Sequence, residues 1–166
     1  MSKTILKKDL ANKRLIITRE FEAPVDMVWQ AWTDPEILDQ WWAPKPWKTE
    51  TVSMDFRVGG MWLYYMKGPE GEKHYCRADY TGITPNKNYK GLDAFCDEKG
   101  NINKEFPQTE WNVTFSPSAT GTTVLVENTF KEITDLEKIL EMGFEQGFAM
   151  AHGNLDEYLA ANLRHK

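Results

Sequence analysis

The sequence has little cysteine, no excess of positive charge and no long apolar run. Its 166 residues include two cysteines, Cys76 and Cys96, which make neither a disulfide framework nor a four-ligand zinc site. Acidic residues outnumber basic ones by 25 to 20, and the net charge of -5 argues against a nucleic-acid-binding surface. No segment reaches the length of a membrane span, and the N-terminus lacks the apolar core of a signal peptide. We therefore expect a cytoplasmic protein with no nucleic-acid partner and no membrane span.

Common catalytic motifs are also absent. The sequence has no G-x-S-x-G, no P-loop, no H-E-x-x-H and no G-x-G-x-x-G. Its three histidines, His74, His152 and His165, are scattered without the spacing of metal ligands, and His152 falls on the solvated flank of a predicted helix. We therefore assign no catalytic residue and predict no metal and no cofactor.

Hydrophobic periodicity predicts a single domain over residues 14–162, between a flexible leader (1–13) and a C-terminal tail (163–166). The predicted elements are a strand at 14–21, helices at 25–32 and 35–41, strands at about 50–57, 61–66, 73–84, 88–96, 111–115 and 122–130, and one long helix from Thr134 or Asp135. The turn-sized gaps between strands favour an antiparallel meander. This order is that of the α+β helix-grip fold, in which a curved antiparallel sheet wraps a long C-terminal helix.

The predicted last helix carries Gly143, Gly147 and Ala151 at intervals of four along its apolar stripe. A glycine inside a helix costs up to about 1 kcal/mol relative to alanine. We therefore expect this stripe either to approach the sheet closely or to leave room for a ligand.

Several local motifs resemble the SRPBCC (START/Bet v 1-like) superfamily and, within it, the homologues of the activator of heat-shock protein 90 ATPase. They are FEAP at 21–24, VWQAWTDPE at 28–36, WWAP at 41–44, DFRVGGMW at 55–62, GTT at 121–123, and Gly143, Phe144, Leu155, Tyr158 and Leu159 in the last helix. The resemblance covers residues 14–162 and departs from the family at 45–47, where Lys-Pro-Trp replaces a stretch with a glycine. It implies a hollow fold, whose relatives hold hydrophobic or amphipathic small molecules, catalyse polyketide cyclisation or dehydration, or bind a chaperone.

The aromatic residues, which make up 13% of the chain and include seven tryptophans, have two interpretations. Trp29 and Trp32 lie on the packing face of a short helix and are assigned to the core, whereas Trp41 is expected to be partly exposed. The others either pack the core or line a pocket, because rigid aromatic side chains are typical of small-molecule sites. The candidate ligand-binding residues are Trp42, Trp47, Met54, Phe56, Trp62, Tyr64, Trp111, Phe144 and Met150.

Polar residues inside the predicted strands are candidates for a polar anchor in such a cavity. They are Tyr75, Arg77, Asp79 and Asp93. The turn at 85–88 is expected to set Asp79 close to Asp93 on the neighbouring strand, as an anchor or an acid–base pair. Alternatively, these side chains face solvent on the convex side of the sheet or pair with Arg77.

We expect a protein that binds a hydrophobic or aromatic small molecule between the sheet and the last helix, without covalent chemistry. Two alternatives stay open. The first, implied by the resemblance, is a chaperone-interaction module connected with the stress response. The second is a cyclase- or dehydratase-like enzyme, in which the four polar candidates converge on the cavity; that hypothesis fails if they face the convex side. No oligomeric state is assigned.

Overall fold

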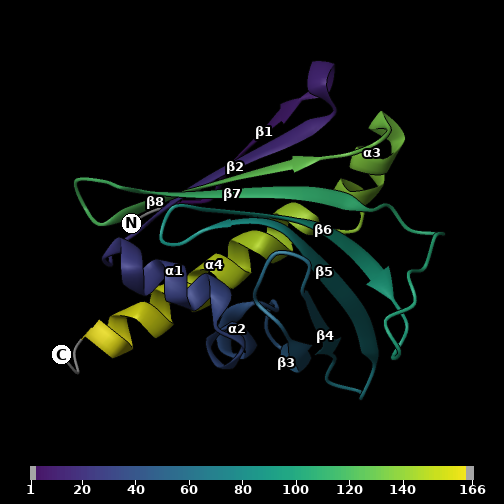
Figure 1. Ribbon diagram of the computed structural model, residues 1–166, viewed down its shortest axis with the longest axis horizontal. Helices are drawn as coiled ribbons and strands as arrows, with labels where there is room; N and C mark the ends of the chain where they lie inside the picture. Colours follow the sequence, from purple (N-terminus) through teal and green to yellow (C-terminus); the bar gives the residue numbers. More distant parts are fainter. Residues whose placement is uncertain (1–2, 164–166) are drawn as a thin grey trace.

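An antiparallel sheet of eight strands curls around a long C-terminal helix in the computed structural model, which describes residues 3–163 (Figure 1). The strands are β1 (Ile5–Asp9), β2 (Arg14–Phe21), β3 (Lys48–Met54), β4 (Met61–Lys67), β5 (Lys73–Thr84), β6 (Asn88–Cys96), β7 (Thr109–Pro117) and β8 (Thr122–Thr129). The helices are the short η1 (Leu10–Asn12), α1 (Val25–Thr33), α2 (Pro35–Trp41), α3 (Ile133–Glu141) and α4 (Phe144–Leu163). The strands follow the order β1-β2-β8-β7-β6-β5-β4-β3, and neighbouring strands are antiparallel. The predicted α+β helix-grip fold is therefore confirmed.

Residues 5–9 form the strand β1 inside the segment 1–13, for which the sequence predicted a flexible leader. β1 pairs with β2 in a register that runs from Ile5 opposite Thr18 to Asp9 opposite Arg14. The prediction was wrong because most β1 side chains are exposed, so the segment has no alternation of apolar and polar residues. The backbone of β1 nevertheless satisfies the N–H and C=O groups of β2, which would otherwise form an open edge of the sheet.

The two short helices α1 and α2 begin where the sequence predicts. Pro24 precedes the first turn of α1, and the side chain of Asp34 caps α2 by accepting a hydrogen bond from the Glu36 N–H at 2.9 Å. α1 packs against β7, and α2 packs against β3 and α4. The pair therefore links β7 in the middle of the sheet and β3 at its edge to the last helix.

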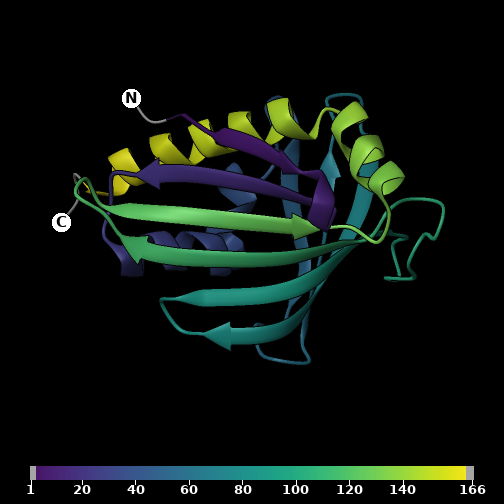
Figure 2. The same ribbon diagram turned by 90° about the horizontal axis from the view of Figure 1, so that it is seen from above.

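The C-terminal segment is divided into two helices, where the sequence predicted one that starts at Thr134 or Asp135. α3 ends at Glu141, and two residues later Gly143 has a φ of 87°, a left-handed conformation that favours glycine just after a helix C-terminus. α4 then runs along the concave side of the sheet, with α3 beyond its first turn (Figure 2). No helix within residues 3–163 is long and apolar enough to cross a membrane. His165 and the rest of the predicted tail after Leu163 lie outside the described residues.

The core between α1, α2, α4 and the sheet is built from aromatic rings. Trp32 is 2% exposed and lies edge-on to Trp41, Phe115 and Phe148, with ring centroids 5.0, 6.0 and 6.2 Å away. Trp41 is fully buried, although partial exposure was predicted, and its indole N–H donates to the Ala31 carbonyl oxygen at 2.9 Å. That hydrogen bond lets the polar edge of the ring enter the core, which hydrophobic periodicity alone does not reveal.

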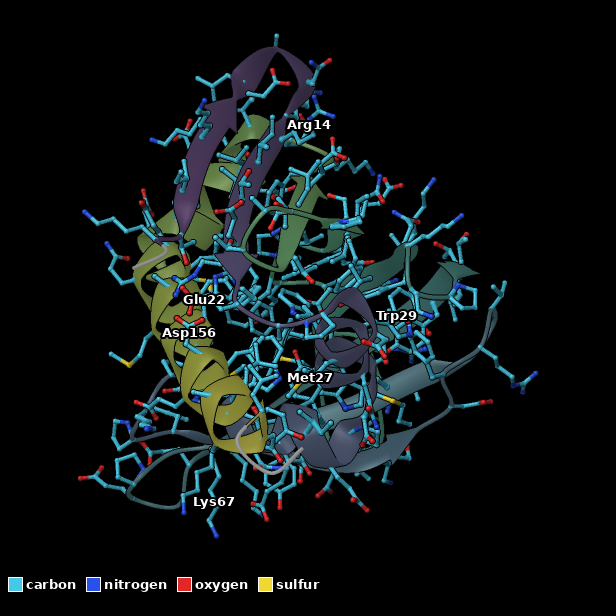
Figure 3. All side chains as sticks on the ribbon, turned by 90° about the vertical axis from the view of Figure 1, so that its left-hand side faces the viewer. Arg14, Glu22, Met27, Trp29, Lys67 and Asp156 are labelled. Atoms are coloured by element: carbon cyan, nitrogen blue, oxygen red, sulfur yellow. The ribbon has the colours of Figure 1, made fainter. Side chains whose placement is uncertain are left out.

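His152 is 1% exposed, although the sequence placed it on a solvated helix flank. Its Nδ1 lies 2.7 Å from the Thr4 hydroxyl, which in turn accepts from Arg19 at 3.0 Å. Arg19 also pairs with Asp156, which lies on α4 beside Glu22 (Figure 3). The prediction failed because it counted Gly143 as part of the helix. The buried face of α4 is instead centred on Phe148, Ala151, Leu155 and Leu159, and His152 adjoins it.

Candidate functional site

A cavity of about 250 Å³ lies between the concave face of the sheet and the α3–α4 junction. Its aromatic lining consists of Trp42, Tyr64, Phe95, Trp111, Phe144 and Phe148. The polar side chains on its surface are His74, Cys76, Asp93, Thr109 and Asn128. A second space of about 30 Å³ adjoins it and shares Trp42, Tyr64, Asp93 and Trp111. The molecule is therefore hollow at the place where the helix-grip fold holds the helix against the sheet.

Strand alternation and register place the polar floor of this cavity. Asp93 on β6 lies opposite Ala78 on β5 and Thr109 on β7, so its side chain shares their inward face. On β8, Asn128 follows Val124 and Val126 at intervals of two and lies opposite Trp111. These three neighbouring strands therefore present a carboxyl, a hydroxyl and a carboxamide to the same space.

The aromatic walls are held by contacts with one another. The Trp42 indole N–H donates to the Tyr64 hydroxyl at 3.1 Å, and the Trp42 and Trp111 ring centroids are 5.8 Å apart. On α4, Phe144 stacks on Phe148 at 5.1 Å, and Phe148 lies 5.7 Å from Trp111. Each ring is fixed by at least one other ring, so the cavity has preformed walls.

Asp93 is a carboxyl enclosed by protein, and its remaining accessible surface lines the two cavities. Burial raises the pKa of Asp93 from 3.8 to about 7, and the charge of Asp79 on the other face of the sheet adds to this rise. The Ala94 backbone N–H and the Trp111 indole act in the opposite direction and lower the pKa, but by less than burial raises it. The indole N–H of Trp111 has no hydrogen bond of normal geometry, so it solvates the carboxylate only weakly. Asp93 therefore exchanges a proton near neutral pH.

Tyr64 and Cys76, which also line the cavity, stay neutral. Burial raises the pKa of the Tyr64 hydroxyl and of the Cys76 thiol well above their ordinary values. A buried neutral thiol is a poor nucleophile, so Cys76 contributes surface rather than reactivity. Within residues 3–163, no three His, Cys, Asp or Glu side chains come close enough to hold a metal ion.

Five of the predicted site residues line the larger cavity, and Trp62 lines the smaller one. The five are Trp42, Tyr64, Asp93, Trp111 and Phe144. Trp62 stacks on Tyr64 with ring centroids 3.9 Å apart and supports the wall from behind.

Four predicted ligand-binding residues do not line either cavity. Trp47 packs on His74 at 5.3 Å, and Phe56 packs on Tyr80 at 4.8 Å. Met54 packs against the core, and Met150 is 48% exposed on the outer side of α4. The Met150 assignment was wrong for the same reason as that of His152, because the apolar stripe was extended back to Gly143.

Three of the four polar candidates lie on the convex side of the sheet. Tyr75, Arg77 and Asp79 alternate with the inward-facing Cys76 and Ala78 on β5. The Arg77 guanidinium donates to both oxygens of Asp79, at 2.9 and 2.6 Å, and to the Gly100 carbonyl oxygen at 2.7 Å. The hypothesis of four polar groups that converge on the cavity is therefore wrong.

The predicted neighbourhood of Asp79 and Asp93 fails because of a β-bulge. Next to the turn, the strand pairing follows the predicted register, from Thr84 opposite Asn88 to Gly82 opposite Lys90. The register shifts between Tyr80 and Gly82, and beyond it Asp79 lies opposite Leu92. One extra residue reverses the alternation, so Asp93 faces inward while Asp79 faces outward.

Sequence reasoning missed several lining residues that simple periodicity could have found. Asn128 is in phase with Val124 and Val126, Thr109 is two residues before Trp111, and Phe148 is four residues after Phe144. Cys76 and His74 alternate inward on β5, but the bulge hides their phase.

Comparison with known proteins agrees with this geometry. Residues 22–160 match the family model described as Activator of Hsp90 ATPase homolog 1-like protein (AHSA1). The chain belongs to this family. The predicted resemblance to an SRPBCC branch is thereby confirmed, and no curated protein matches the chain.

Solved structures of similar proteins cover nearly the whole AHSA1-like chain. A crystal structure from Mycobacterium smegmatis is 34% identical with a TM-score of 0.87, and the match covers 95% of this chain and 96% of that one. An NMR structure from Arthrobacter aurescens is 32% identical with a TM-score of 0.88, covering 95% and 91%. A crystal structure from Nitrosomonas europaea is 27% identical with a TM-score of 0.81, covering 93% and 98%. The AHSA1-like fold therefore extends over β1 to α4.

Proposed function

We propose that this AHSA1-like protein binds a hydrophobic or aromatic small molecule in the cavity between the sheet and the α3–α4 junction. The observation that carries the proposal is a preformed space of about 250 Å³ with six aromatic residues on its wall. Such a space corresponds to about eight water molecules at about 30 Å³ each, so it is far larger than a packing defect. Apolar walls with a few polar groups are typical of small-molecule sites.

The size of the cavity limits the ligand. Sites for drug-sized molecules usually have volumes of about 300–1,000 Å³, and this cavity lies just below that range. A molecule of one or two aromatic rings with a short polar substituent matches the space and its lining. Larger ligands require the rim formed by Met142 and Phe144 to move.

A pair of glycines on α4 offers a direct test. Gly147 lines the cavity, and a Cβ added there would meet only Pro44, at 3.7 Å. Gly153 lies on the same helix with nothing within 4 Å of an added Cβ, and it lines neither cavity. The Gly147→Leu variant should fill the cavity and abolish binding, whereas Gly153→Leu should bind as wild type does.

Binding is measured by NMR titration and thermal shift with a panel of one- and two-ring aromatic compounds. A ligand that saturates the wild-type protein raises its Tm, because it binds only the folded state. Equal affinity of Gly147→Leu and wild type would place the ligand elsewhere, and no binding by wild type would refute the proposal. Circular dichroism verifies that both leucine variants are folded.

A chaperone partner rests on the family description alone, which names an activator of the Hsp90 ATPase. The large apolar side chains exposed on the surface, such as Ile5, Val52, Leu92 and Met150, come from different elements. No change in the ATPase rate of the chaperone upon addition of the protein would remove this alternative.

A further inference from the structure

Among residues 3–163, the Asp93 carboxyl has no positively charged partner. None of the ion pairs among residues 3–163 involves Asp93. The cation on the neighbouring strand, Arg77, lies on the convex face and is engaged by Asp79 and the Gly100 carbonyl. A buried carboxylate without a counter-charge is costly unless something in the site compensates it.

A second polar group on the floor is also unmatched. Asn128 is 1% exposed, and its Oδ1 has no hydrogen-bond partner, although buried polar atoms are nearly always paired. Asn128 lines the larger cavity, but this oxygen itself is covered by protein atoms, whereas the Asp93 carboxyl faces the space. Asp93 is therefore the acceptor that a donor group in the cavity can reach.

We propose that the ligand of this cavity is an aromatic molecule with a protonated amine, which donates to Asp93. The inference rests on the proposed function, because it names the chemical class of ligand for the same site. An ammonium group carries several N–H donors and a positive charge, so it can donate to Asp93 and neutralise the carboxylate. The rings of Trp42, Trp111 and Phe148 surround this space, and aromatic faces attract cations.

Other ligand classes fit the same lining less well. A neutral alcohol can hydrogen-bond with Asp93 but leaves its charge uncompensated, and a carboxylate ligand is repelled by it. Among the titratable groups that face Asp93, burial keeps Tyr64, Cys76, Tyr80 and Tyr89 protonated and neutral. His74 lines the cavity at its exposed end, and Asp79 acts from the convex side. The expected order of affinity is amine, then alcohol, then acid.

Three indole compounds of the same shape separate these classes. Tryptamine, tryptophol and indole-3-acetate share a ring and a two-carbon side chain and differ in the charge at its end. At pH 8, isothermal titration calorimetry with the full chain should show tryptamine binding at least about tenfold more tightly than tryptophol, with indole-3-acetate weakest. Equal binding of tryptamine and tryptophol would overturn the inference and leave the proposed function intact, whereas no binding of any aromatic compound would refute both.

A variant without the Asp93 carboxyl tests whether this group causes the preference for the amine. Asp93→Asn should lose the preference for tryptamine while it binds tryptophol within about threefold of wild type. The matched control Asp79→Asn removes a carboxylate from the other face of the same strand pair and should keep the preference. A preference retained by Asp93→Asn would overturn the inference.

A proton-release measurement does not depend on any variant. Because amine binding requires the ionised carboxylate, wild-type protein at pH 6.5 should release protons when tryptamine binds. Calorimetry in buffers of different ionisation enthalpy detects this release, and affinity should rise between pH 6 and 8. Tryptamine binding without proton release and without pH dependence would contradict the assignment.

Discussion

Asp93 faces a cavity inside the protein and has no ion pair among the described residues, so the fold itself controls its charge. In the unfolded chain its carboxyl has a pKa near 3.8, and in the folded protein the pKa is about 7. Between these values the folded state binds the proton more tightly, so folding is progressively disfavoured as pH rises through this window. Above about pH 7 both states are ionised, and the penalty is constant. The ionised Asp93 that would bind a ligand therefore lowers the stability of the protein when no ligand is bound.

The first prediction concerns the Asp93→Asn variant, which cannot ionise. The free energy of unfolding of the variant minus that of wild type should increase by on the order of 2–4 kcal/mol from pH 4 to pH 8. Only wild type acquires a buried charge over this range, and that charge destabilises its folded state. Guanidinium unfolding at both pH values measures the difference. A difference independent of pH would show that Asp93 keeps an ordinary pKa.

Single residues of the site were predictable where their side chains follow simple periodicity. Tyr64 and Trp111 were identified as aromatic residues on predicted strands, Trp42 beside a loop and Phe144 on the last helix, and the structure places all four on the cavity wall. Asp93 was identified as a polar residue inside a strand, but its face was left open. Its enclosure depends on rings from β4, β7 and α4 that are distant in sequence, which no local pattern encodes.

At the scale of elements, the break between α3 and α4 explains an apparent conflict in the sequence. A glycine at position 143 would be unfavourable inside one long helix, but it is favourable at the end of α3, where φ is 87°. The break also sets the phase of α4, so that Phe148 and Leu155 face the core and Met150 faces solvent. Periodicity detects helices well, but a change of phase within an apolar stretch of 30 residues or so is weak evidence for a break.

The second prediction compares alanine at two glycines of this region. Gly143→Ala should destabilise the protein by about 1–2 kcal/mol, because alanine is strained at positive φ. Gly153→Ala should stabilise it by about 0.5–1 kcal/mol, because the residue lies in a helix interior with open space around it. Thermal unfolding should show Tm shifts of opposite sign, and a stabilising Gly143→Ala would contradict the assigned junction.

For the whole molecule, two buried groups make opposite contributions to pH dependence. Burial lowers the pKa of His152 from 6.5 to about 3, and the nearby Arg19 charge lowers it further. Below about pH 6.5 the unfolded chain binds a proton at His152, whereas the folded protein does not. The contribution of His152 to the stability of the fold therefore falls as pH falls. Asp93 acts in the opposite sense over about pH 4 to 7. Where the two pH ranges overlap, the two groups change the stability with pH in opposite directions, and the changes cancel.

The third prediction follows from this cancellation. Wild-type stability should change little between about pH 4.5 and pH 6.5, whereas the stability of His152→Gln should fall as pH rises, by up to about 1.4 kcal/mol per unit. Asp93→Asn, measured over the same range, should show the reverse slope. Urea unfolding at half-unit intervals gives all three curves, and parallel curves for wild type and His152→Gln would refute the buried neutral imidazole.

The fold and the element order from β2 to β8 were predictable, because the change from a 3.6-residue to a 2-residue period and the turn residues are local signals. The strand β1 was not, since most of its side chains are exposed and show no alternation, and its pairing with the backbone of β2 is not a local signal. The cavity volume was not either, because an empty space depends on how all its walls fit together.

The bulge in β5 has a consequence for the evolution of such sites. It separates the register of Gly82 with Lys90 from that of Asp79 with Leu92, and so decides which β5 side chains face inward. A relative that lacks the extra residue, with β6 in the same place, would turn Arg77 and Asp79 into the cavity and Cys76 out of it. One codon inserted or deleted can therefore exchange a neutral lining for a charged one. Alignments of such relatives need to match inward-facing positions, since matching the order of residues alone pairs side chains from opposite faces.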